Sequence, residues 1–201
     1  MRDSLNQNFF KSSNDSRKSS SDDLALWRSI KNGNDLAFSS LYNRYAQQLF
    51  NYGMHLCHNR ELCKDSIQEL FTYLWNRKES LSEIDSVKYY LLKSFRNLLI
   101  KSIEKDRKFF VDLDDKHEQF QPETFVEEEI ILKEINFLKR EKMNFALSNI
   151  PKRQREIIVL RYFNEMNYQE ISSLMGISVP SAHNLLSKSL QSMLAIIGKS
   201  K

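Results

Sequence analysis

The stretch NYQEISSLMGISVPSAHNLLSKSL, residues 167–190, contains the end of one helix and the start of another within about three residues. Asn167 followed by Glu170 fits a capping box, in which each side chain accepts a hydrogen bond from the other residue's amide. Gly176 supplies the left-handed conformation that ends a helix, and Ser178 is placed to cap the next one. Pro180 falls in the first turn of that helix, where an amide hydrogen has no intrahelical partner. The stretch therefore predicts two crossed helices joined by a tight turn.

The two helices have an apolar face toward each other and a polar face on the second helix. The packing residues at helical spacing are Ile171, Met175, Ile177, Ala182, Leu185 and Leu186. This pattern is typical of a helix-turn-helix, and a helical hairpin that does not bind DNA is the alternative. The candidate DNA contacts are short, polar or basic residues suited to a major groove: Ser178, Val179, Ser181, His183, Asn184, Ser187 and Lys188. Phosphate contacts are expected partly from four basic residues of the preceding segment: Lys152, Arg153, Arg155 and Arg161.

The composition of the whole chain favours long helices. Of 201 residues, 41% are hydrophobic and 28% charged, with four Gly and three Pro. No apolar run is long enough for a membrane helix, and the amino terminus lacks a signal-peptide core, so we expect a cytoplasmic protein without membrane insertion. The net charge is +4 over residues 24–105, −5 over 106–141 and +5 over 142–201. This layout suits two modules that approach a polyanion, although solvated helix faces of uneven sign would give the same counts.

The spacing of apolar residues predicts the organisation of the chain. Residues 1–21 are rich in Ser, Asn and charge, which predicts a disordered tail. Apolar residues three and four apart then predict helices on either side of Asn32-Gly33-Asn34, and further helices over about 62–75 and 86–103. Residues 22–105 are thus expected to form one domain, residues 106–139 an acidic linker in which helical spacing resumes from Ile130, and residues 140–197 a second domain. The predicted fold class is all-α, with two small helical domains joined by a flexible linker.

Three stretches together resemble one protein family. LSNIPKRQREIIVLRYFNEMNYQEISSLMGIS, residues 147–178, resembles region 4 of sigma-70 family transcription initiation factors in its Leu-x-x-x-Pro start, Arg155-Glu156, Leu160-Arg161 and Tyr168-x-Glu170-Ile171. DSIQELFTYLW, beginning at Asp65, is similar to region 2.2, and VKYYLLKSFRNLL, beginning at Val87, to regions 2.3 and 2.4. The presence of these two regions alone resembles the extracytoplasmic-function group, and SVPSAHNLLSKSL resembles its members from the Bacteroidetes.

The resemblance implies a function and a set of partners. It implies a factor that binds the bacterial core RNA polymerase and directs it to promoters, with region 2 capturing and melting the minus-ten element and region 4 reading the minus-thirty-five element of promoter DNA. It implies no enzymatic activity, no cofactor, and an anti-sigma partner that is often membrane-anchored. Many relatives carry several Arg or Lys along the recognition helix, whereas His183 and Lys188 are the basic candidates here.

The resemblance also implies site residues in region 2. It places polymerase binding at Asp65, Gln68 and Glu69, which would otherwise be read as solvated polar residues. It places the minus-ten contact at Asn97, with Lys93, Arg96 and Lys101 adding positive charge for phosphates. The loop from Asn76 to Asp85 is the matching candidate for holding a flipped-out base. Three aromatic residues are candidates for base stacking, but the apolar stripe favours a core position for the last two: Tyr89, Tyr90 and Phe95.

Other functions have less support in the sequence. His55, Cys57, His58 and Cys63 include zinc-ligand types, but Cys57 and His58 are adjacent on a helix and point about 100° apart, so no metal site is predicted. No Gly-rich phosphate loop or nucleophile elbow is present, and no catalytic residue is predicted. The remaining alternatives are a helix-turn-helix regulator that acts without polymerase and an all-helical interaction module. Residues 62–104 discriminate, because an operator-binding regulator has no use for the DSIQELFTYLW helix.

Overall fold

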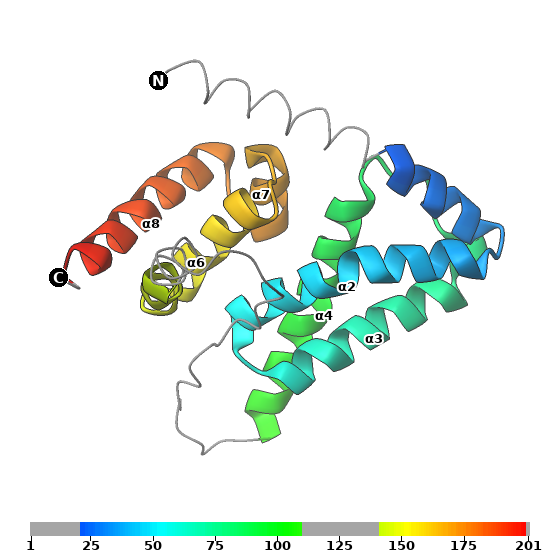
Figure 1. Cartoon of the computed structure of the whole chain (residues 1–201), viewed down its shortest axis with the longest axis horizontal. Helices are drawn as coiled ribbons and strands as arrows, with labels where there is room; N and C mark the ends of the chain where they lie inside the picture. Colours follow the sequence, from blue (N-terminus) through cyan, green and yellow to red (C-terminus); the bar gives the residue numbers. More distant parts are fainter. Residues whose placement is uncertain (1–20, 110–140, 200–201) are drawn as a thin grey trace, which may run out of the picture. The chain divides into compact units, whose positions relative to one another are not determined.

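The computed structural model describes residues 21–109 and 141–199, and these residues form helices and turns without a strand. They divide into two compact units, one of residues 21–51 and 60–109 and one of residues 52–59 and 141–199. Figure 1 labels the main helices of each unit. The prediction of an all-α fold with two helical domains is confirmed.

The first unit begins with helical residues 21–31. It continues through α2 (Asp35–Cys57) as far as Asn51, and then through α3 (Arg60–Asn76), the short 3-10 helix η1 (Lys78–Ser80) and α4 (Val87–Phe109). Residues 52–57 of α2 belong to the second unit. The predicted break at residues 32–34 is confirmed, since Gly33 has φ 82° and Asn34 Oδ1 accepts a hydrogen bond of 3.0 Å from the Ala37 amide. The break therefore ends one helix with a left-handed residue and starts the next with an N-cap.

The core of the first unit is built from the apolar stripes of its helices. Each fully buried aliphatic or aromatic side chain contributes roughly 1.5–3 kcal/mol to the stability of the fold, because its apolar surface is removed from water. The helices α3 and α4 pack directly on each other. The side chains exposed by 1% or less include Trp27, Ile30, Leu41, Leu49, Leu70, Leu74, Leu91, Leu92, Phe95 and Leu99. The position of Phe95 confirms it as a core residue.

A buried carboxylate ties helical residues 21–31 to α2. Asp23 is 4% exposed, and its two oxygens accept hydrogen bonds from Arg44 Nη1 and from the Tyr45 hydroxyl. Burial, together with the hydrogen bond to Asp23, raises the pKa of Tyr45 above its ordinary value. A buried charge of this kind is tolerated only when it is paired and hydrogen-bonded, so the three side chains stabilise the fold as a group.

The helix α4 is longer than predicted. The sequence predicted its end near Ile103 and a linker from residue 106, but the helix continues to Phe109. Its sequence contains neither Gly nor Pro, so no helix-breaking residue ends it at residue 106. The remainder of the predicted linker, the predicted tail apart from Ser21, and residues 130–140 of the predicted helix lie outside the described residues.

The second unit contains helical residues 141–148, α6 (Lys152–Ile158), a π-helical turn η2 (Val159–Phe163), α7 (Tyr168–Met175) and α8 (Val179–Lys199). Both α6 and α7 pack on α8. The π turn was not predicted. It ends where the Asn164 amide donates to Val159 O at 2.9 Å, while the Asn164 side chain donates to the same oxygen at 3.1 Å. Each hydrogen bond of a π turn closes a longer ring than a hydrogen bond of an α-helix does. This wider turn ends the helix before the chain enters α7.

Candidate functional site

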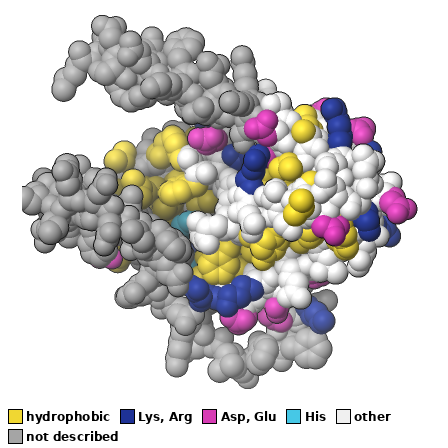
Figure 2. Space-filling view, turned by 45° about the vertical axis from the view of Figure 1, so that its right-hand side comes forward, with side chains coloured by type: hydrophobic (Ala, Val, Ile, Leu, Met, Phe, Trp, Pro, Cys, Tyr) yellow, Lys and Arg dark blue, Asp and Glu magenta, His cyan; other side chains and the backbone are white. Residues whose placement is uncertain are grey.

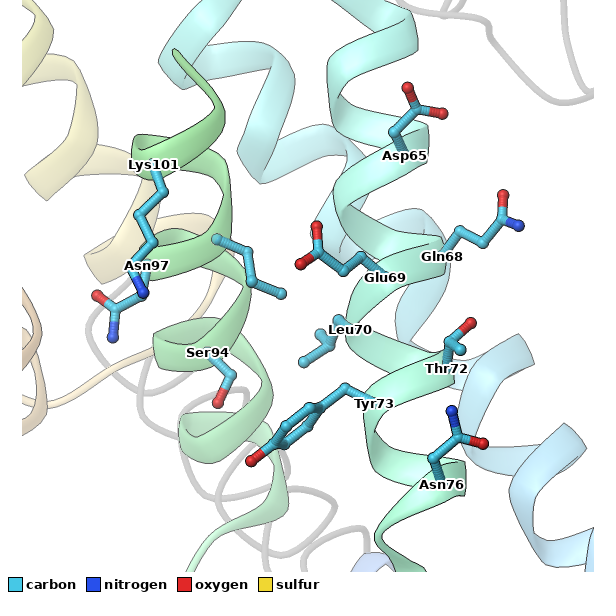
Figure 3. A pocket seen from close by; sticks show the side chains of 11 residues that line it. Asp65, Gln68, Glu69, Leu70, Thr72, Tyr73, Asn76, Ser94, Asn97 and Lys101 are labelled. Atoms are coloured by element: carbon cyan, nitrogen blue, oxygen red, sulfur yellow. The ribbon is translucent and has the colours of Figure 1, made fainter. Parts of the chain in front are cut away.

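A groove between α3 and α4 gathers most of the site residues predicted in region 2. Figure 3 shows Glu69 of α3 pointing toward α4, on which Asn97 and Lys101 stand. Apolar and aromatic side chains also line it, including Leu70, Leu98 and Tyr73. The groove therefore brings together the predicted polymerase contacts Asp65, Gln68 and Glu69 with two predicted minus-ten contacts, Asn97 and Lys101.

Gln68 lies on a ridge rather than inside one groove. It points away from α4 in Figure 3, and both Gln68 and Thr72 also line a second groove, between α2 and α3. That second groove is aromatic: the Phe38 ring lies 4.9 Å from Trp75, and the Tyr42 ring lies 4.9 Å from Phe71. Hydrophobic side chains reach the molecular surface between charged ones in Figure 2. The ridge thus presents polar groups between the two grooves.

The other two basic residues predicted for the minus-ten element do not line the groove. Lys93 is exposed, with its ammonium group 5.5 Å from the centroid of the Tyr89 ring. Arg96 is half-buried on α4. Because Lys93, Asn97 and Lys101 are four residues apart, they share one face of the helix. Tyr90 is half-buried and packs edge-on against Trp27 at 5.0 Å, which supports its assignment to packing.

The loop after α3 is held in place and carries two cation–π pairs that the sequence analysis missed. The Trp27 indole donates to Ser82 O at 3.1 Å, and Lys31 donates to Glu83 at 2.6 Å. The hydrogen bond and the charge of Lys31 lower the pKa of Glu83. At the start of the loop, Arg77 lies over Tyr73 at 5.1 Å and Lys78 over Trp75 at 4.4 Å. The available signal was the pair of aromatic residues followed closely by two basic residues in YLWNRK, and such pairs suit single-stranded nucleic acid.

The turn between α7 and α8 has the geometry predicted for it. The Asn167 side chain accepts from the Glu170 amide, and the Glu170 side chain accepts from the Asn167 amide, both at 2.9 Å. Gly176 has φ 64° and ψ 43°, and Ser178 Oγ accepts from the Ser181 amide at 3.2 Å. The capping box, the left-handed glycine and the serine cap are therefore confirmed. Gly176 and Ser178 thus form the turn from α7 into α8, while the capping box fixes the start of α7.

The outward face of α8 is open to solvent. Among the residues predicted to contact the minus-thirty-five element, Val179 is half-buried and the others are exposed: Ser178, Ser181, His183, Asn184, Ser187 and Lys188. Ile171, Met175, Ala182 and Leu186 are buried beneath them, whereas Ile177 and Leu185 are half-buried. His183 stacks on Tyr168 of α7, with the ring centroids 3.5 Å apart and the ring planes 22° apart.

Arg155 does not lie where a phosphate contact would need it, whereas Arg153 is exposed. Arg155 is 5% exposed, and its guanidinium donates to Leu147 O at 2.8 Å, to Ser148 O at 2.9 Å and to Ile150 O at 3.4 Å. The first two carbonyls lie in the last turn of helical residues 141–148 and the third lies just after it, where no intrahelical donor reaches them. Arg155 therefore caps a helix end inside the unit, which speaks against the predicted contact with DNA.

Within residues 21–109 and 141–199, no three His, Cys, Asp or Glu side chains are grouped so that they would hold a metal ion. Over the same ranges, no helix has the length and apolar content needed to cross a bilayer.

Comparison with known families gives two matches in the order that the motifs predicted. Residues 41–109 match the family model described as sigma-70 region 2, and residues 140–193 match the one described as sigma-70, region 4. RNA polymerase sigma factor YlaC of Bacillus subtilis is 25% identical over 150 residues, which cover 75% of this chain and 86% of that protein. ECF RNA polymerase sigma factor SigM of the same organism is 25% identical over 165 residues, covering 82% of this chain and 97% of that protein.

Solved structures support the same fold. CnrH, solved in complex with the cytosolic domain of CnrY, gives a TM-score of 0.61 at 17% identity, covering 89% of this chain and 99% of that chain. RpoE, solved with the anti-sigma factor NepR from Bartonella quintana, gives 0.63 at 14% identity, covering 82% and 98%. At these identities the likeness concerns the fold alone.

The two region matches and the sigma-factor relatives identify this chain as a member of the sigma-70 family, in its extracytoplasmic-function group. It is a transcription initiation factor that directs core RNA polymerase to promoters. The region 2 match removes the alternative of a helix-turn-helix regulator that acts without polymerase. The relatives come from Bacillus subtilis, so the finer resemblance to Bacteroidetes members stays a prediction.

Proposed function

We propose that the ridge of α3 docks core RNA polymerase through Asp65, Gln68 and Glu69, while the facing side of α4 holds the minus-ten strand. The observation that supports both roles is the shared groove, which polar side chains of α3 line together with Asn97 and Lys101 of α4. Asn97 offers both a donor and an acceptor for a base edge, and Lys101 offers a charge for a phosphate. Lys93 and Arg96 extend the positive charge along the same helix.

The second unit reads duplex DNA at the minus-thirty-five element through the exposed face of α8. Ser178, Ser181, Asn184 and Ser187 offer hydrogen bonds without charge, and Lys188 and Arg153 offer phosphate contacts. Val179 offers an apolar contact of the kind that fits a thymine methyl group. Arg155 is left out of this interface because backbone carbonyls already occupy its guanidinium.

The factor acts in the cytoplasm, where bacterial core polymerase and the chromosome are found. An anti-sigma protein is proposed as a further partner. Its support is the similar fold of RpoE, which was solved with the anti-sigma factor NepR. An anti-sigma protein that covers the α3 ridge would compete directly with polymerase.

Substitution of Gln68 tests the docking site. Gln68→Ala removes the polar group at the crest of the ridge, so affinity for core polymerase should fall about five- to tenfold in a fluorescence anisotropy titration. Asn43→Ala is the matched control, because Asn43 is exposed on α2 and lines neither groove. Equal affinities for both variants and the unaltered protein, with unchanged helical content, would remove this role for the ridge.

A further inference from the structure

The stack between Tyr168 and His183 links the start of α7 to the exposed face of α8. The rings lie face to face at 3.5 Å, which is closer than most aromatic pairs in proteins. His183 is exposed and Tyr168 half-buried. The tyrosine is therefore the anchored member of the pair, and the histidine is the member that faces solvent.

A third side chain fixes the tyrosine from the preceding segment. Arg161 lies over the Tyr168 ring, with its guanidinium carbon 5.1 Å from the ring centroid. The same guanidinium donates to Met166 O at 2.8 Å, so it cannot swing freely. Tyr168 also begins α7 directly after the Asn167 cap, which fixes its backbone. The stack thus rests on three elements: the end of η2, the start of α7 and the second turn of α8.

Stacking determines what His183 can do. It occupies the face of the imidazole and leaves the ring edge, where both nitrogens lie, available to a hydrogen-bonding partner. An exposed imidazole otherwise rotates broadly about its second side-chain torsion and loses entropy when it binds. His183 shares its helix face with Asn184 and Ser187, which are also exposed. Its fixed edge therefore stands among side chains suited to hydrogen bonds with base edges.

We propose that Tyr168 is a positioning residue for sequence readout: it orients His183 so that an imidazole nitrogen meets a base edge in the major groove. This inference rests on the proposed reading of DNA by α8. Tyr168 then sets the preference at one base pair without touching that base. A recognition helix rich in Lys or Arg is attracted to the phosphates of every DNA sequence alike. On α8, which carries few charges, discrimination between sequences depends more on how side chains such as His183 are oriented.

The test measures base preference rather than total binding. Holoenzyme assembled from core polymerase and the full chain is bound to promoters randomised at the minus-thirty-five element, and bound DNA is sequenced. Both His183→Ala and Tyr168→Leu should reduce the preference at the same base pair about two- to tenfold, the range expected for a stacked pair or one base contact. Tyr168→Phe keeps the ring and should keep the preference. A ratio between base pairs does not change when part of a variant is unfolded, so poor folding cannot imitate the result.

The double variant distinguishes positioning from an independent role. If Tyr168 acts through His183, Tyr168→Leu combined with His183→Ala should lose no more preference than His183→Ala alone. Additive losses, or a Tyr168→Leu variant that keeps the preference while His183→Ala loses it, would overturn the positioning role and leave the reading by α8 intact. If the unaltered holoenzyme shows no preference at any minus-thirty-five base pair, the proposed function of α8 fails instead.

Discussion

The two helices proposed to face DNA, α4 and α8, differ sharply in charge. The 23 residues of α4 include seven Lys or Arg against two acidic residues. The 21 residues of α8 include two Lys and no acidic residue. Phosphate contacts supply affinity and base contacts supply specificity. The contrast indicates that the first unit contributes mostly salt-sensitive affinity, and the second unit mostly hydrogen bonds whose value depends on geometry.

The largest expected effects test whether the two units unfold independently of each other. Leu91 of α4 and Ile171 of α7 are both fully buried, and replacing either with Ala should cost about 2–5 kcal/mol in the free energy of unfolding. Both tryptophans of the chain, Trp27 and Trp75, lie in the first unit, so tryptophan fluorescence reports on that unit alone. In urea titrations, Leu91→Ala should lower the fluorescence midpoint, and Ile171→Ala should lower only a transition seen by circular dichroism.

Leu194→Ala is the control for these two core substitutions. Leu194 is 68% exposed, so its replacement should change the free energy of unfolding by less than about 0.5 kcal/mol. A fall in the fluorescence midpoint of Ile171→Ala as large as that of Leu91→Ala would mean that the units unfold together. The comparison between them would then lose its thermodynamic basis.

The next largest effects on stability are expected from substitutions of two glycines in the second unit. Gly176 has φ 64° with no atom within 4 Å of an added Cβ, so Gly176→Ala should cost about 1–2 kcal/mol through backbone strain alone. Gly198 has equally open space and no positive φ, so Gly198→Ala should stabilise α8 by up to about 1 kcal/mol. Thermal unfolding followed by circular dichroism measures both. Changes of the same sign would show that the turn does not depend on a left-handed residue.

Salt dependence of promoter binding addresses the charge contrast directly. Lys101→Ala should reduce the slope of log K against log salt for holoenzyme by about 0.7–0.9, the value of one lost phosphate contact. Asn184→Ala should weaken binding to the preferred minus-thirty-five sequence and leave that slope unchanged, because an amide releases no counterion. If the two variants exchanged these signatures, the roles assigned to α4 and α8 would be reversed.

The smallest expected effect concerns the exposed pair between Lys31 and Glu83. The hydrogen bond from Lys31 lowers the folded-state pKa of Glu83 below its ordinary 4.5, so the pair stabilises the first unit above that pH and loses this contribution as pH falls through the folded-state pKa. The unaltered protein should therefore be slightly more stable than Lys31→Met at pH 7, with the difference vanishing in acid. In a Glu83→Gln background the Lys31→Met effect should not vary over this range, and a retained pH dependence would assign it to another group.

The parts of the fold that follow local rules could be predicted from the sequence. Asn167, Glu170, Gly176 and Ser178 each act on backbone groups within a few residues of themselves, and the structure confirms each role. The break at Gly33 follows the same logic. The end of α4 was placed too early, because acidic composition was read as a linker although no helix breaker was present.

Features that depend on distant groups could not be predicted in the same way. The π turn before Asn164 has no local signature, because α-helix and π-helix accept the same residue types. Among the site residues, helical spacing placed Asn97 and Lys101 on one face, but the groove exists only because α3 packs beside α4. Arg155 was predicted to contact phosphate because the outward face of α8 has few basic residues. The sequence pattern does not reveal that backbone carbonyls accept the hydrogen bonds of its guanidinium instead.

The helix end held by Arg155 has a consequence for how family alignments are interpreted. A fixed arginine in a DNA-binding region is easily taken as a sign of selection for nucleic-acid contact. Here selection would preserve it for a different reason, since only a planar fork with several donors reaches all of its carbonyl acceptors and lysine would not replace it. An invariant arginine at this position of an alignment would then reflect the capping of one helix end, and would carry no information about the promoter sequence.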